Sequence, residues 1–144
     1  MMTKLVCMFL LMAGSTAQAI AGQGCPYSSA IKYVDGYFQA AQQSLLWQSP
    51  KVEKRDFVDQ FIGAIFTPGK EQARENGHLD KCVYRTGSGH VVALRLGKQD
   101  EVERMSLTST LHWQLSSDPL GQEIYICQDS QPDNCAFTVQ RTKR

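Results

Sequence analysis

The cysteines constrain the fold of this chain more than any other feature of its sequence. The chain has five cysteines, and Cys7 lies in an N-terminal segment that we expect to be removed on export. An even number in an exported chain predicts two disulfides, although four cysteines allow three connectivities. The remaining four are Cys25, Cys82, Cys127 and Cys135.

The N-terminus has the layout of a secretory signal peptide. Lys4 supplies one positive charge, an almost wholly apolar run follows, and Ala17-Gln18-Ala19 fits a cleavage site. The apolar run is about ten residues long, whereas a membrane span needs roughly 20. We therefore expect a signal peptide at residues 1–19. Residues 20–144 would then be one exported domain with no stable membrane anchor, in the periplasm or outside the cell.

The charge of this domain is balanced. The chain has 15 basic and 14 acidic residues, and Lys4 is the one charged residue of the predicted signal peptide. The exported part is therefore neutral when its histidines are neutral. It offers no basic field for a nucleic acid, so we expect no nucleic-acid partner.

The segment from Tyr125 to Phe137 places two cysteines eight positions apart, with turn-forming Asp, Ser, Pro and Asn residues between them. Zinc sites use cysteine pairs two to four residues apart, and redox centres favour Cys-x-x-Cys; neither spacing is present. Opposed strand residues lie close enough for a disulfide. We predict a Cys127–Cys135 bridge in a hairpin of two terminal strands, with Cys25–Cys82 as the second bridge.

Two further hairpins are predicted from their turns. Asp35-Gly36 lies between two apolar runs, which is typical of a two-residue β-turn. A helix also fits these apolar residues, but Gly36 would cost it about 1 kcal/mol, so the hairpin is favoured. The second hairpin spans residues 79–96, where β-branched and aromatic runs flank Thr86-Gly87-Ser88-Gly89.

Other segments are less clear. Residues 57–66 fit both a helix face and a strand buried on both sides, and a minor helix is possible within residues 50–77. The charged segment 97–105 is expected to be exposed. Core anchors are expected at Leu107, Leu111 and Trp113.

Chemically active residues form no recognisable catalytic set. A metal site of His78, Asp80 and His90 competes with the simpler interpretation that these are polar residues beside a turn, which is favoured. A Cys82–His112 nucleophilic pair would need a reduced cysteine, which export argues against.

The acidic run contains Asp100, Glu101 and Glu103, and it is more typical of a charged loop than of a glycosidase pair. No common hydrolase, metalloprotease or phosphate-binding motif is present. We expect no cofactor and no metal.

Aromatic residues are the remaining binding candidates. Trp47 and Trp113 are typical core residues in a small domain. If either is exposed near Tyr27, Tyr37 or His112, it would mark a recognition surface. The binding site that we predict consists of Trp47, Trp113, Tyr37 and His112.

A spaced pattern of cysteine, glycine and aromatic residues covers most of the exported part. It resembles a family of small exported bacterial proteins known only as a domain of unknown function. The resemblance implies a bacterial source, export and a β-rich fold, which favours a strand at residues 61–66, and it supplies no catalytic residues. The pattern consists of Cys25-Pro26, Ile31-x-Tyr33-x-x-Gly36-x-Phe38-x-Ala40, Trp47-x-Ser49-Pro50, Phe61-x-Gly63-Ala64, Cys82-x-Tyr84, Trp113, Cys127 and Cys135-x-Phe137.

Together these features predict an all-β or β-rich α+β domain, with a small antiparallel sheet built from hairpins and two disulfides. The favoured function is a non-catalytic binding or inhibitor module that binds a protein or a cell-envelope component. An envelope structural or immunity-type protein with a cognate bacterial partner, or a small hydrolase with a cryptic site, are the alternatives. The oligomeric state stays open.

Overall fold

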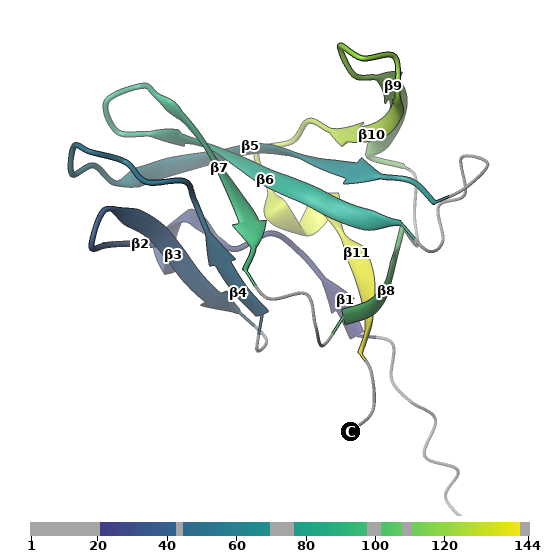
Figure 1. Ribbon diagram of the computed structural model, residues 1–144, viewed down its shortest axis with the longest axis horizontal. Coiled ribbons are helices and arrows are strands. Elements are labelled where there is room, and N and C mark those ends of the chain that lie inside the picture. The colour runs from purple at the N-terminus through teal and green to yellow at the C-terminus, as the bar shows by residue number, and fades with distance from the viewer. Residues whose placement is uncertain (1–20, 43–44, 70–76, 98–101, 108–110, 142–144) are drawn as a thin grey trace, which may run out of the picture.

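The computed structural model describes residues 21–42, 45–69, 77–97, 102–107 and 111–141, and strands dominate this part of the chain (Figure 1). The predicted signal peptide lies outside the described residues, as do residues 70–76 of the region where a minor helix was considered. The rest of that region contains strands and loops. The β-rich fold class is therefore confirmed.

Eight strands form a large antiparallel sheet, in the spatial order β2-β3-β4-β7-β6-β5-β10-β9. Its two edges are therefore β2 and β9, which lie at opposite ends of the sheet in Figure 1. The strands are β2 (Lys32–Val34), β3 (Tyr37–Gln42), β4 (Leu45–Gln48), β5 (Val58–Thr67), β6 (His78–Thr86), β7 (Val91–Leu96), β9 (Trp113–Ser117) and β10 (Glu123–Cys127).

A small antiparallel sheet joins distant parts of the chain, in the order β1-β11-β8. Two 3-10 turns complete the described elements: η1 (Ser28–Ala30) follows β1, and η3 (Pro132–Cys135) precedes β11. The strands of this sheet are β1 (Ala21–Gln23), β8 (Val102–Ser106) and β11 (Phe137–Arg141).

The core lies where the small sheet packs against the inner face of the large one. The rings of Trp47 and Phe137 meet edge-on with centroids 6.3 Å apart. The backbone N–H of Leu79 lies 3.4 Å from the sulfur of Met105. All four residues are almost fully buried, and burial of such apolar side chains is the main force that holds the two sheets together.

The two turn-based hairpin predictions are confirmed. Val34 pairs with Tyr37 across a two-residue turn, in which Asp35 has φ 51° and Gly36 has φ 91°. Positive φ at both central positions is the type I′ geometry that the Asp-Gly pair favours. Strands β6 and β7 pair antiparallel around the turn that contains Ser88.

Both disulfides form, with the expected pairing. Cys25 is bonded to Cys82 and Cys127 to Cys135, with Cα atoms 5.8 and 5.7 Å apart. The hairpin predicted around the second bridge is wrong, however. Strand β10 pairs with β5 and β9, whereas β11 pairs with β1 and β8 in the other sheet. The Cys127–Cys135 bridge therefore fastens the crossover between the two sheets.

Two smaller expectations are also wrong. The segment 97–105 is not uniformly exposed: its end belongs to β8, and Met105 is 2% exposed because it packs beneath β6. Leu111 is 83% exposed and is no core anchor, while Leu107 and Trp113 are buried as expected. Leu111 lies outside the strands, shortly before the edge strand β9.

Candidate functional site

A pocket of about 350 Å³ opens between the loop that precedes β5 and the turn that joins β6 to β7. Its floor is apolar, because Phe38 and Val92 are buried there beside the partly buried Val52. Its rim is polar. The volume falls within the range of small-ligand sites, which combine apolar walls with a few polar groups. The polar lining residues are Lys54, Arg55, Asp56, Thr86, Ser88 and His90.

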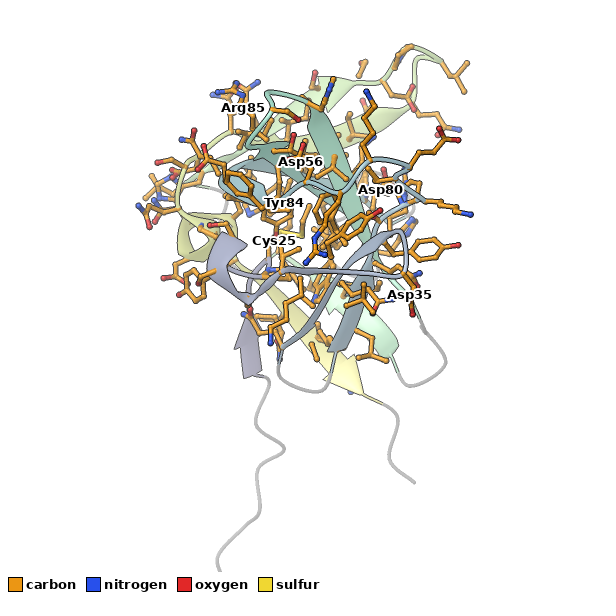
Figure 2. All side chains as sticks on the ribbon, turned by 90° about the vertical axis from the view of Figure 1, so that its left-hand side faces the viewer. Cys25, Asp35, Asp56, Asp80, Tyr84 and Arg85 are labelled. Carbon is orange, nitrogen blue, oxygen red and sulfur yellow. A yellow bond between two sulfur atoms is a disulfide. The ribbon has the colours of Figure 1, made fainter. Side chains whose placement is uncertain are left out.

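Asp56 connects the two sides of the pocket. One carboxylate oxygen accepts a hydrogen bond of 2.8 Å from the backbone N–H of Phe57, and the other accepts the hydroxyl of Ser88 in a short contact. These bonds, the one from Ser88 first, lower the pKa of Asp56 below its ordinary value. The carboxylate is therefore ionised at neutral pH and holds the turn against the loop. Figure 2 shows its position in the molecule.

The turn itself is held by its backbone and by one buried hydroxyl. The N–H of Gly87 donates to the carbonyl of Phe57 over 2.9 Å. The hydroxyl oxygen of Thr86, a residue only 4% exposed, accepts the N–H of His90 over 3.1 Å. A side chain at position 87 would collide with the ring of Phe57. The rim is thus a fixed structure, with both sides joined before any ligand arrives.

Two cations on the rim have no counter-ion among the described residues. Lys54 and Arg55 are exposed, and neither forms an ion pair with another described residue; the described ion pairs are Arg95–Asp80 and His112–Asp129. Asp56 is held by hydrogen bonds to the turn, and its negative charge leaves Lys54, Arg55 and Asp56 with a net charge of +1. The rim therefore favours an anionic group on a ligand whose neighbouring part is apolar.

The pocket contains Asp, His and Ser but not the geometry of a hydrolytic triad. In such a triad the histidine lies between the carboxylate and the nucleophile. Here the carboxylate of Asp56 accepts the Ser88 hydroxyl directly. The imidazole of His90 makes no hydrogen bond with another described residue; only its backbone N–H and carbonyl are bonded. Asp56, Ser88 and His90 are therefore not arranged as a hydrolytic triad.

The residues of the metal hypothesis are not brought together. His78 begins β6, and His90 follows the turn at the far end of the same strand. Asp80 lies 3.8 Å from Arg95 instead. Within the described ranges, no group of three or more His, Cys, Asp or Glu side chains is placed to hold a metal ion. Cys82 is disulfide-bonded and has no free thiol for His112 to activate.

The four aromatic and histidine candidates do not share one surface. Trp47 and Trp113 are 2% and 4% exposed, so both indole rings belong to the core. The Trp113 N–H donates to the carbonyl of Ala136 over 3.1 Å. Tyr37 is half-buried at the start of β3, whereas His112 is exposed beside β9, at the other end of the sheet.

Sequence reasoning did not find the pocket. Residues 54–56 and 86–90 are separated by most of two strands, and only the antiparallel pairing of β5 with β6 brings them together. A larger concavity of about 580 Å³ lies on the outer face of β2, β3 and β4. Lys32 is its one charged residue, so it offers fewer groups to orient a ligand. Asp100 and Glu101 lie outside the described residues.

The strands and bridges define a small β-rich domain with two disulfides, and its pocket has the composition of a binding site. The chain belongs to a family of proteins of unknown function, DUF3757, whose family model matches residues 19–138. No curated protein and no solved structure gives a significant match. In the described part of the chain, no helix is both long enough and apolar enough to span a membrane.

Proposed function

We propose that this protein is an exported bacterial binding module that acts without catalysis, in the periplasm or outside the cell. The observation that carries the proposal is the rim of the pocket, where Lys54 and Arg55 have no counter-ion among the described residues. Two such cations above an apolar floor are suited to bind a partner that presents an anionic group beside an apolar one.

The disulfides support the proposed location. Two bridges form between buried cysteines, and such bonds persist in oxidising compartments, such as the periplasm or the medium. The N-terminal sequence supports the same location through its predicted signal peptide.

The rigidity of the pocket supports binding. Asp56 and Ser88 tie the loop to the turn, and Gly87 is bonded to Phe57 on the same side. A site that is already ordered loses little conformational entropy when its ligand arrives. The partner that we propose is an exported protein or a cell-envelope component that presents an acidic group to Lys54 and Arg55, with an apolar group over Val92.

Affinity capture tests this proposal. The protein, expressed with its own N-terminal segment and purified in the oxidised state, is the bait, and envelope extract and culture medium are probed by mass spectrometry. A saturable partner is expected. The double variant Lys54→Gln/Arg55→Gln should bind it roughly tenfold to a hundredfold more weakly, because hydrogen bonds to charged groups contribute about 1.5–3 kcal/mol.

A matched control removes two cations elsewhere. Lys51 and Arg85 are exposed and do not line the pocket, so Lys51→Gln/Arg85→Gln gives the same change of net charge and should bind as the wild type does. Near-ultraviolet circular dichroism checks that both variants are folded. A partner that both variants retain equally, or the absence of any saturable partner in either extract, would contradict the proposal.

A further inference from the structure

Strand β9 differs from the other sheet edges. The large sheet ends at β2 and β9, and the small sheet ends at β1 and β8. Open edges present unpaired N–H and C=O groups, and proteins protect them by keeping the strand short or by placing charges on it. Strands β1 and β2 have only three residues each, and β8 carries Glu103 and Arg104.

Strand β9 has neither kind of protection. It has five residues, Trp-Gln-Leu-Ser-Ser, with no charge and no proline. It pairs with β10 without a register shift, so no bulge twists the edge away. Nothing in the described part of the chain pairs with its open side. Four of its five side chains are exposed, and Leu115 is 49% exposed.

From these observations we infer that the open edge of β9 docks against β9 of a second copy of this chain. The two strands would pair antiparallel about a two-fold axis at Leu115, which joins two large sheets into one. A two-fold contact uses the same surface on both copies, so the surface must be complementary to itself. An uncharged strand meets that condition, because no charge on it is placed opposite its own copy.

The register follows from the side chains. Placing Leu115 opposite its copy brings two exposed apolar residues together. Because Leu115 already pairs with Tyr125 of β10, the contact continues a row of apolar side chains across both sheets. The same register places Gln114 opposite Ser116 of the second copy. At the strand ends it places His112, which lies 3.7 Å from Asp129 of its own copy, opposite Asp118 of the second copy.

Sedimentation velocity over a wide range of protein concentration tests the inference. The sample is the full-length protein after export and disulfide formation, compared with variants that carry charges on β9. The wild type is expected to form a concentration-dependent dimer. Gln114→Lys/Ser116→Lys places lysine opposite lysine and should weaken dimerisation by about tenfold or more. Gln114→Lys/Ser116→Glu places lysine opposite glutamate in the proposed register and should dimerise at least as well as the wild type.

Several results would overturn the inference. A wild type that stays monomeric at all concentrations would do so. A lysine–lysine variant that dimerises as strongly as the wild type would do so as well. If the edge accepts a strand of a different protein instead, the purified wild type will be monomeric. If a variant does not fold, amide hydrogen exchange of the wild type tests the dimer instead. The amides of residues 113–117 should become better protected as the protein concentration rises. Unchanged protection would refute the dimer. The test is independent of the pocket at Lys54 and Arg55.

Discussion

The two disulfides are chemically alike and equally buried, but they hold very different lengths of chain. Cys25–Cys82 joins residues 57 positions apart and fixes the N-terminal segment to the middle of the large sheet. Cys127–Cys135 joins residues eight positions apart, where the chain leaves one sheet for the other. All four cysteines are at most 1% exposed, so burial does not distinguish the two bridges.

The surroundings of the two bridges differ as well. Near the first, the hydroxyl of the buried Tyr84 donates to the carbonyl of Pro26 over 2.6 Å, and Figure 2 shows Tyr84 beside Cys25. Near the second, the enclosed loop is partly open to solvent and is held by Asp129. The first bridge thus secures the core, whereas the second secures a crossover. Loop length, rather than depth of burial, should therefore rank the contributions of the two bridges to stability.

The largest effect is expected from Cys25→Ala/Cys82→Ala. Opening a bridge between residues 57 positions apart should lower the free energy of unfolding by about 4.2 kcal/mol in the chain-entropy treatment of loop closure. Urea denaturation of the wild type and of the variant, both purified from an oxidising host, measures the difference. A loss below about 2 kcal/mol would contradict the ranking by loop length.

A smaller effect is expected from Cys127→Ala/Cys135→Ala. The enclosed loop is much shorter, so the same treatment gives a loss of about 2.6 kcal/mol, roughly 1.6 kcal/mol less than for the first bridge. The same denaturation series measures it. If this variant proves less stable than the first, the bridge at the crossover must contribute more than loop closure, for example by fixing how the two sheets meet.

The segments that sequence predicted well are those whose turns determine them. Asp35 and Gly36 are the residues that a type I′ turn requires, and they adopt its dihedral angles. The hairpin of β6 and β7 follows in the same way from its glycine-rich turn. In both cases the paired strands are neighbours in sequence, so no information about distant segments was needed.

Strand β5 shows why periodicity alone failed. Its ladder with β6 is shifted between Val58 and Gln60 and again between Phe61 and Gly63. Each shift adds a residue and breaks the alternation of buried and exposed positions. Val58, Phe61 and Ala64 are therefore buried at a spacing of three, which resembles a helix. A sequence cannot show such bulges before the partner strand is known.

The predicted pairing of the last two strands was wrong, and the pocket was not predicted, for a different reason. Strands β10 and β11 are close in sequence and are connected through a disulfide loop, yet they join different sheets. Alternation within a strand does not say which sheet it enters. The pocket likewise depends on Asp56 meeting Ser88, a contact that only the pairing of β5 with β6 creates. Long-range pairing was the missing information in both cases.

The smallest effect is expected from the loop inside the second bridge. Asp129 accepts the backbone N–H of Gln131 over 2.8 Å, receives the amide of Asn134 over 3.1 Å and lies 3.7 Å from His112. These contacts, the one from Gln131 first, lower the pKa of Asp129 below its ordinary value. A carboxylate with a lowered folded-state pKa stabilises the fold above its unfolded pKa of about 3.9, and this contribution is lost as the pH falls through the folded value.

Asp129→Asn should therefore be less stable than the wild type at neutral pH, and the difference should close as the pH falls below about 4. Urea denaturation at a series of pH values measures it, with Asp59→Asn as the control, because Asp59 is exposed and makes no hydrogen bond or ion pair with a described residue. A difference that stays constant with pH would mean that the asparagine disturbs the turn by its shape rather than by its missing charge. In that case the short loop would depend on its disulfide and its backbone alone, and the contrast with the core bridge would be one of loop length only.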